Sequence, residues 1–248
     1  MRVRHHPLGD CWSVRTCAAA RCLTAVIPYL GYSRADKRHG CREAISSSMV
    51  ADLLQAVGIG HVVTMDLHAP QIEGFFHVPV DSLTAVPTLC ETIRPQIPQG
   101  LVVVAPDAGR VKMATEYAHR FDAPVVVLHK RRAGGAETAV THLVGDVRDK
   151  SCLIIDDMIS TGDTIAQATE ALRKAGAHPD ITVAATHGLL LPVARERLNE
   201  VGINKIFVTD TLRVSQGEWP QLQVVSVAPV FAAALQRFMV DGSLGDLF

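Results

Sequence analysis

The segment LIIDDMISTGDT, residues Leu153–Thr164, decides the fold of this chain. A continuously apolar run, Cys152–Ile155, leads into Asp156 and Asp157, and a turn of small residues then leads into a helical pattern. Two carboxylates at the end of a strand can accept hydrogen bonds from neighbouring sugar hydroxyls. The turn and the helix start offer N–H groups, hydroxyls and a positive dipole end to a phosphate. The segment therefore predicts a site for a phosphorylated pentose.

The residue types suggest which part of this segment would contact the sugar and which part the phosphate. Asp156 and Asp157 are expected to orient the sugar, and the phosphate is expected to lie against Ser160, Thr161, Gly162, Asp163 and Thr164. The alternative is an acidic helix start in which Asp163 and Thr164 serve only as caps. Two hydroxyl residues and a glycine directly before the helix favour the phosphate site over that alternative.

The rest of the chain alternates short apolar runs with helix-period segments. Predicted strands are Leu23–Ile27, His61–Met65, Leu101–Ala105, Val125–Leu128, Cys152–Ile155, Ile181–Ala185, Lys205–Thr209 and Val224–Val227. Most are apolar throughout, which is expected for a parallel sheet covered on both faces. Apolar stripes predict helices over Ile45–Val57 and Ile165–Ala175, stopped by Gly58 and Gly176. The alternation predicts an α/β fold with mainly parallel sheets.

Composition narrows the class of protein. The chain has 248 residues, 48% of them hydrophobic, and a formal net charge of −1, so no global field attracts nucleic acid or an anionic membrane. Six cysteines are scattered without a CxxC pair and are expected to be free thiols. The short apolar run Cys17–Ala20 lies close to Arg15 and Arg21, so neither a signal peptide nor a membrane span is predicted. These observations favour a soluble protein of the cytoplasm.

Four further segments place charged or polar residues directly after apolar runs. They are PYLGYSRADKR (Pro28–Arg38), VVTMDLHA (Val62–Ala69), VVAPDAG (Val103–Gly109) and VVLHKRR (Val126–Arg132). Ligands of open α/β sheets bind beyond the carboxyl ends of the strands, where these residues would gather. Taken alone, His68 is more often a packed core histidine than a ligand, and Lys130 with its neighbours is more often surface charge.

Taken together and in this order, the segments resemble the ribose-phosphate pyrophosphokinases, which transfer the diphosphate of ATP to ribose 5-phosphate. The likeness runs from about Leu23 to Phe248, and the His68 segment separates it from that of phosphoribosyltransferases. It implies two phosphoribosyltransferase-like domains. The first, residues 1–84, is cut short and forms the ATP side. The second, residues 85–248, forms the ribose 5-phosphate side, with its last helix packing on the first domain.

The resemblance also assigns roles to residues. It implies ATP binding by Arg34, Ala35 and His68, and Mg²⁺ binding by His68 and Asp107. Asp107, Ala108 and Gly109 correspond to the pyrophosphate loop, and Lys130 and Arg132 to the catalytic pair of a mobile loop. Members of the family are homo-oligomers.

This sequence departs from the family pattern at several positions. Arg110 and Asp163 stand where the family usually has glycine, Ala35 where many members have glutamine, and His39 where many have aspartate. A carboxylate at position 163 is expected to repel a phosphate, so Asp163→Gly should tighten binding of ribose 5-phosphate.

Two other functions stay open at this point. One is a catalytically impaired homologue that binds phosphoribosyl ligands or active subunits and acts as a regulator. The other is a phosphoribosyltransferase, which the segment Asp156–Thr164 alone would permit. A Rossmann dehydrogenase and a Walker-type kinase are disfavoured, because neither GxGxxG nor GxxxxGK[ST] occurs in the sequence.

Overall fold

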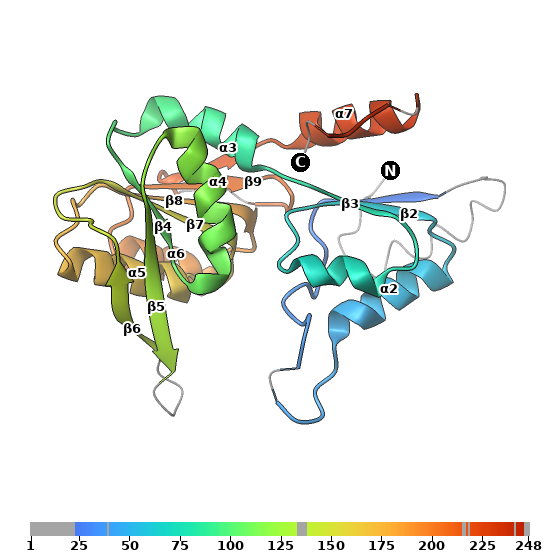
Figure 1. The fold of residues 1–248 in the computed structure, drawn as a ribbon, viewed down its shortest axis with the longest axis horizontal. Helices are drawn as coiled ribbons and strands as arrows, with labels where there is room; N and C mark the ends of the chain where they lie inside the picture. Colours follow the sequence, from blue (N-terminus) through green and yellow to red (C-terminus); the bar gives the residue numbers. More distant parts are fainter. Residues whose placement is uncertain are drawn as a thin grey trace. The chain divides into compact units, whose positions relative to one another are not determined.

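Figure 1 shows the computed structural model, which describes residues 23–38, 40–132, 138–214, 217, 219–240 and 242–245. For residues 130–132 and 138–141 the description covers the backbone alone. Contacts between Cα atoms divide the chain into two compact units. The first ends at Thr84 and also includes the segment from Arg237 onward, and the second runs from Ala85 to Gln236.

The first unit is built on a parallel three-stranded sheet of order β1-β2-β3. Its elements are β1 (Thr24–Ile27), α2 (Ser46–Ala56), β2 (His61–Met65), the 3₁₀ helix η1 (Pro70–Phe75) and β3 (Val80–Leu83). Val50 and Leu54 of α2 pack with Val62 of β2 and Ile72 of η1 in one apolar core. Helix α2 ends just before Gly58, whose φ of +94° terminates it as the sequence predicted.

The second unit contains a seven-stranded sheet of order β10-β9-β8-β7-β4-β5-β6. Its strands are β4 (Val102–Ala105), β5 (Val125–Arg132), β6 (Thr138–Val144), β7 (Cys152–Ile159), β8 (Ile181–Gly188), β9 (Lys205–Thr209) and β10 (Leu222–Val225). Every neighbouring pair is parallel except β5 and β6. The order places β4 directly beside β7, so the loops that leave these two strands meet at one edge of the sheet.

Helices cover both faces of this sheet, as Figure 1 shows. They are α3 (Val86–Ile93), α4 (Val111–Phe121), α5 (Asp163–Lys174) and α6 (Pro192–Glu200), with the short helices η2 (Arg94–Gln96) and η3 (Ala108–Arg110) beside α3 and α4. Helix α7 (Ala228–Phe238) follows β10 and is drawn away from this sheet. Helices α3 and α4 pack together, as do α5 and α6. Buried residues of β7, such as Ile154, pack with Ile165 and Leu172 of α5 in the main core. Burial on both faces explains why these strands are apolar throughout.

The α/β class with mainly parallel sheets is therefore confirmed, and several local expectations need correction. Strand β8 continues beyond Ala185 to Gly188, and β10 is Leu222–Val225 and not Val224–Val227. Strands β3 and β6 were not predicted from the sequence. Residues Val80–Leu83 include two polar residues in four, and β6 pairs antiparallel with β5.

Strand β7 does not end at Ile155, because its pairing with β8 continues through Asp156 as far as Ile159. Strand β5 likewise continues through Arg132, so Lys130 and Arg132 lie in a strand and not in a loop.

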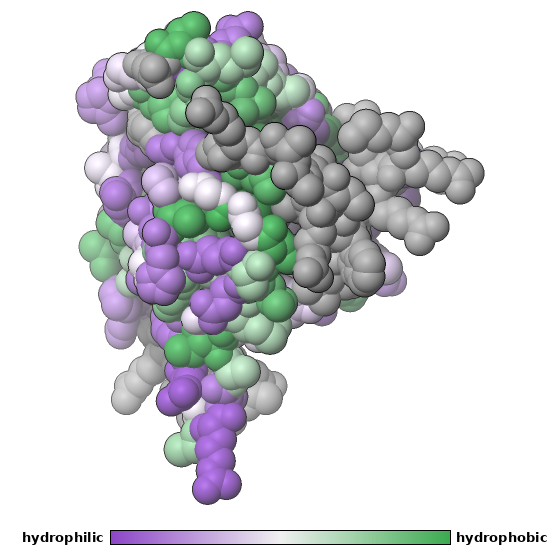
Figure 2. All heavy atoms as spheres, turned by 90° about the vertical axis from the view of Figure 1, so that its right-hand side faces the viewer, coloured by the Kyte–Doolittle hydropathy of each residue, from purple (hydrophilic) through white to green (hydrophobic). Residues whose placement is uncertain are grey.

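Cys41, Cys90 and Cys152 are free thiols, as expected, and burial raises the pKa of the latter two to about 12. The expectation for Cys11, Cys17 and Cys22 lies outside the described residues. Among the helices that the structure describes, none combines the length and the apolar character needed to cross a bilayer. The face drawn in Figure 2 mixes hydrophilic and hydrophobic side chains.

Candidate functional site

Two adjacent aspartates form the centre of the candidate site. Asp156 and Asp157 lie within β7, and their side chains are only 10% and 2% exposed. Successive residues of a strand normally point to opposite faces of the sheet, but a hydrogen bond links these two residues. The Oδ1 atom of Asp156 accepts a hydrogen bond from the backbone N–H of Asp157 at 2.9 Å. Two carboxyl groups are thus buried within an otherwise apolar strand.

A single arginine bridges the two carboxylates. Arg110 Nε lies 3.2 Å from Asp156 Oδ1, and Arg110 Nη2 lies 3.3 Å from Asp157 Oδ1. Arg110 ends η3, which follows β4, and β4 is the sheet neighbour of β7. Its side chain is 13% exposed, so the ion pairs are largely shielded from water. Adjacency of β4 and β7 therefore places a cation over the acid pair.

The surroundings of Asp156 shift its carboxyl group toward the protonated form. Burial is the main cause that raises the pKa of Asp156 well above its ordinary range, and the neighbouring carboxyl of Asp157 raises it further. Arg110 acts in the opposite direction and lowers that pKa, whereas Asp107 adds to the rise.

Asp107 belongs to the same edge of the sheet. It follows β4 and caps η3, where its Oδ1 accepts a hydrogen bond from the backbone N–H of Gly109 at 2.8 Å. Ala108 and Gly109 form the turn between Asp107 and Arg110. The predicted pyrophosphate loop therefore follows the end of β4, beside the stretch of β7 that carries the predicted sugar carboxylates, and Arg110 connects the two.

The turn after β7 leads into α5, as the sequence predicted. Gly162 has a φ of +80°, and a Cβ atom there would lie 3.2 Å from Leu198 Cγ of α6. Both features favour glycine. Ser160 is tied through its carbonyl to the backbone N–H of Leu191 at 3.0 Å. The first N–H groups of α5 have no partner inside the helix, as at any helix start, which suits an anion.

Asp163 is held by a partner that the sequence analysis missed. Its Oδ1 lies 2.7 Å from Nη1 of Arg197 in α6, and its Oδ2 accepts a hydrogen bond from Thr161 Oγ1 at 2.7 Å. Arg197 Nη1 also donates to the carbonyl of Thr161 at 2.8 Å. The carboxylate at position 163 is therefore neutralised inside this turn. No local signal reveals this pair, because its two members are far apart in the sequence.

Buried threonines support the neighbouring strand end. His187 of β8 makes a 2.9 Å contact from Nδ1 to Oγ1 of Thr211, and Thr209 Oγ1 donates to the carbonyl of Thr186 at 2.6 Å. His187 is paired with Met158 in the sheet, one residue beyond the acid pair. A buried and satisfied polar network of this kind fixes the carboxyl end of β8 beside that of β7.

In the first unit, the segments around Arg34 and His68 are joined by one hydrogen bond. Gln71 Nε2 in η1 donates to Oδ2 of the buried Asp36 at 2.5 Å. Arg34 is exposed, and the backbone N–H of Ala35 donates to Tyr32 O at 2.8 Å in a tight turn. His68 follows β2 and is half-buried. The structure thus connects the two predicted ATP segments, although 35 residues separate Asp36 from Gln71.

The structure does not bring the remaining predicted residues together. The side chains of Lys130 and Arg132 and the whole of His39 lie outside the described residues. His68 and Asp107 belong to different units. Among the residues that the structure describes, no group of three or more His, Cys, Asp or Glu side chains is placed to hold a metal ion.

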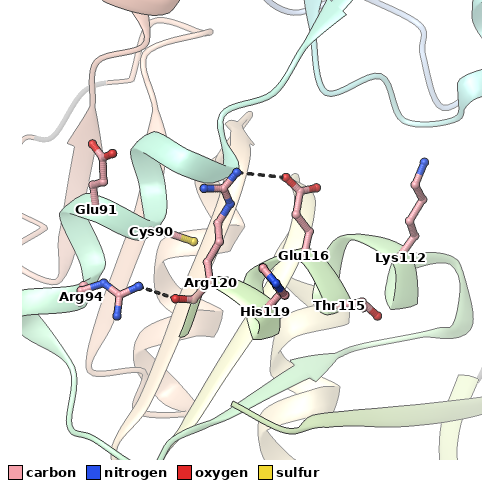
Figure 3. A pocket seen from close by; sticks show the side chains of 8 residues that line it. All are labelled: Cys90, Glu91, Arg94, Lys112, Thr115, Glu116, His119 and Arg120. Carbon is pink, nitrogen blue, oxygen red and sulfur yellow. Dashed lines mark hydrogen bonds and ion pairs between the residues drawn. The ribbon is translucent and has the colours of Figure 1, made fainter. Parts of the chain in front are cut away.

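A separate open groove of about 990 Å³ lies along α3 and α4 (Figure 3). None of the predicted site residues lines it. Arg120 Nη2 lies 3.9 Å from Glu116 Oε1 there, and Arg94 donates to the carbonyl of Arg120. Its cations are thus partly paired within the groove itself, and the acid pair of β7 stays the better candidate for chemistry.

Comparisons with known proteins agree with the geometry. Ribose-phosphate pyrophosphokinases of Streptomyces avermitilis and Corynebacterium efficiens are each 42% identical to this chain, over 93% of it and 72% of their own length. The chain belongs to the ribose-phosphate pyrophosphokinase family. Residues 11–58 match the model of the N-terminal domain of ribose phosphate pyrophosphokinase, and residues 132–248 match the phosphoribosyl synthetase-associated domain.

A solved structure of the family supports the assignment independently. The phosphoribosylpyrophosphate synthetase from Mycobacterium smegmatis matches with a TM-score of 0.86 and 38% identity. The match covers 95% of this chain and 78% of that protein. Membership of the ribose-phosphate pyrophosphokinase family therefore rests on both sequence and fold.

The buried acid pair predicts a measurable dependence of stability on pH. Because the folded-state pKa of Asp156 is raised, the folded chain holds this proton more tightly than the unfolded chain. Stability from this group is therefore present at low pH and is lost as pH rises through the folded-state pKa. Asp156→Asn cannot ionise, so it avoids this loss of stability as pH rises. We therefore expect its Tm to be higher by about 2–4 °C at pH 7.5, the shift produced by ~1 kcal/mol in a chain of this size.

Thermal denaturation of both proteins between pH 4.5 and 8 measures this effect. The gap in Tm should widen as pH rises, and Glu170→Gln, which alters an exposed acid of α5, should show no such trend. An Asp156→Asn variant that is less stable than the parent at neutral pH would contradict this assignment of charge.

Proposed function

We propose that this chain transfers the diphosphate of ATP to O1 of ribose 5-phosphate, giving phosphoribosyl pyrophosphate and AMP. The observation that carries the proposal is the cluster of Asp107, Arg110, Asp156 and Asp157 at one sheet edge, beside the turn that starts α5. In a ribose-phosphate pyrophosphokinase, this cluster would be the sugar side of the diphosphate-transfer site. The proposal includes two phosphoribosyltransferase-like domains, divided after residue 84, and a location in the cytoplasm.

The sugar phosphate would be held at two points. Asp156 and Asp157 would accept hydrogen bonds from the neighbouring hydroxyls of the pentose. The 5-phosphate would lie at the start of α5, against Ser160, Thr161, Gly162, Asp163 and Thr164. The N–H groups of a helix start and nearby hydroxyls favour such an anion. Binding at two points fixes the direction of the anomeric hydroxyl, which is most of what a positioned phosphoryl transfer requires.

In the reaction, the anomeric oxygen attacks the β-phosphorus of ATP. The bond from that phosphorus to the oxygen bridging it to the α-phosphorus breaks, AMP leaves, and the hydroxyl proton is released. Arg34, Ala35 and His68 would hold ATP in the first unit. Lys130 and Arg132 would contact the transferred diphosphate, and Arg132 is suited to bind two phosphoryl oxygens at once.

Mg²⁺ fits Asp107, one of the two residues that the resemblance assigns to it. Asp107 offers carboxylate oxygens, the ligand type that Mg²⁺ prefers, and lies directly after β4 at the sheet edge. Mg²⁺ commonly uses only one or two protein carboxylates together with substrate phosphates, so a dense cluster of protein ligands is not required. Asp107 and His68 would hold the ion, which neutralises phosphate charge when bound.

Partners follow from the same proposal. ATP and ribose 5-phosphate are the substrates, and the chain is expected to form a homo-oligomer. Met239 and Val240 are 85% and 75% exposed, and an association between copies is one way to cover such apolar side chains. Neither nucleic acid nor a membrane has a role in this proposal.

The activity is tested by incubating the purified chain with ATP, Mg²⁺ and ribose 5-phosphate, and following AMP and phosphoribosyl pyrophosphate by ³¹P NMR. The two products should form in equal amounts. We expect Lys130→Ala to lower kcat by about 10²–10³-fold, because it removes a charge from the transition state. Lys174→Ala, at the opposite end of α5 from the phosphate turn, should leave kcat unchanged. Equal kcat in Lys130→Ala and the parent would remove Lys130 from the mechanism.

The pair formed by Asp163 and Arg197 predicts opposite effects of two single substitutions. Arg197→Ala leaves the carboxylate of Asp163 uncompensated and should weaken ribose 5-phosphate binding by about 2–5-fold. Asp163→Gly leaves the guanidinium facing the turn and should tighten binding by a similar factor. The effects are modest because the Asp163 side chain is 54% exposed and solvent screens its charge.

The double variant Asp163→Gly with Arg197→Ala provides the control, because it removes both charges together. Its dissociation constant for ribose 5-phosphate, measured by calorimetry, should return close to that of the parent. Tighter binding in Arg197→Ala alone would show that the charge of Asp163 does not face the phosphate.

A further inference from the structure

We propose that Arg110 is a positioning residue for the sugar, which holds Asp156 and Asp157 in the arrangement that receives two neighbouring hydroxyls. This inference rests on the proposed function and deepens it, because it names the residue that sets the preference for ribose. The resemblance described above implies glycine at this position in most of the family, whereas this chain has arginine.

The backbone fixes the origin of the Arg110 side chain. Its N–H donates to the carbonyl of Asp107 at 3.2 Å, and the residue forms the junction between η3 and α4. The strand before η3 is β4, which pairs with β7 up to Val104 and Ile154, two residues before the acid pair. The guanidinium therefore reaches the carboxylates from a neighbouring strand end that is held by the sheet itself.

Arg110 is expected to stay in place when a sugar binds. Displacing it by a neutral diol would leave two carboxylates, 10% and 2% exposed, without their cation, which is strongly unfavourable for buried charge. The ion pairs with Arg110 use the Oδ1 atom of each aspartate. A carboxylate has about four acceptor positions, so contact with one guanidinium does not exhaust its capacity for hydroxyl donors.

The guanidinium also fixes the geometry of the pair. One planar group contacts both carboxylates, through Nε on one side and Nη2 on the other. A lysine ammonium could supply the charge, but not two donors held in a rigid plane. Arg110 should therefore matter most for a ligand that uses both aspartates at once, as a vicinal diol does. A sugar phosphate that lacks one of the two hydroxyls should depend on Arg110 much less.

Calorimetry with ribose 5-phosphate and with 2-deoxyribose 5-phosphate tests this. We expect Arg110→Ala to weaken binding of ribose 5-phosphate by about tenfold or more, the loss expected when a buried, charge-assisted contact is removed. Binding of 2-deoxyribose 5-phosphate should change by no more than about twofold, because its affinity comes chiefly from the 5-phosphate. Arg110→Lys should restore part of the affinity for ribose 5-phosphate.

Thermal denaturation confirms that each variant is folded. The matched control is Arg173→Ala, whose guanidinium donates to the carbonyl of Gly202 at 3.1 Å and not to the acid pair. Unchanged or tighter ribose 5-phosphate binding in Arg110→Ala overturns the inference, as does an equal loss for both sugars. If the parent chain binds neither sugar phosphate, the proposed function fails together with the inference. If the parent binds both but the variants do not differ, only the inference fails.

Discussion

The contact of one guanidinium with two buried carboxylates is the constraint on which the candidate site depends. Asp156 and Asp157 interrupt an apolar strand at a position where both side chains are shielded from water. Without Arg110, burying both groups as carboxylates would cost stability, because their like charges would lack this cation. The sheet order solves the problem, because it sets the loop after β4 next to the end of β7. Fold and site chemistry are thus linked through this one adjacency.

The turn before α5 is the second feature of the site, and there too an arginine from a neighbouring element balances the charge of an aspartate. This ion pair is more exposed and therefore weaker. Asp163 would oppose a phosphate if it stood alone, but Arg197 of α6 neutralises it and at the same time holds the carbonyl of Thr161. Leu198, the next residue of α6, lies against the position where a side chain at Gly162 would project. One short helix therefore shapes the turn by packing and balances its charge. The two departures from the family pattern, Arg110 and Asp163, each form an ion pair with a residue of a neighbouring element.

Features that a local sequence pattern controls were predicted well. Continuous apolar runs gave the buried parallel strands, and glycines after apolar stripes gave the ends of α2 and α5. It failed where pairing with a distant strand decides the outcome. Strand β7 continues through Asp156 because the backbone of Asp156 is paired with Ala185 of β8, whatever the polarity of its side chain. Strand β6 forms because it can pair antiparallel with β5, which its own composition does not reveal.

The site was predictable to a similar extent. Asp107, Asp156, Asp157 and the turn Ser160–Thr164 were expected at strand ends of one sheet. The structure places Asp107 after β4 and the turn after β7, whereas Asp156 and Asp157 lie within β7, just beyond its pairing with β4. The partners of these residues were not predictable, because Arg110 and Arg197 make contacts that depend on strand order and helix packing. Charge compensation at long sequence separation is a property of the fold, and no spacing rule within one segment encodes it.

The most direct measurement of the central claim is the affinity of ribose 5-phosphate for the parent chain and for a variant carrying Asp156→Asn with Asp157→Asn. The account predicts that the parent binds ribose 5-phosphate more tightly than inorganic phosphate, and that the double variant, still folded, binds both with similar affinity. If the double variant bound ribose 5-phosphate as tightly as the parent, the buried acid pair would not be the sugar site.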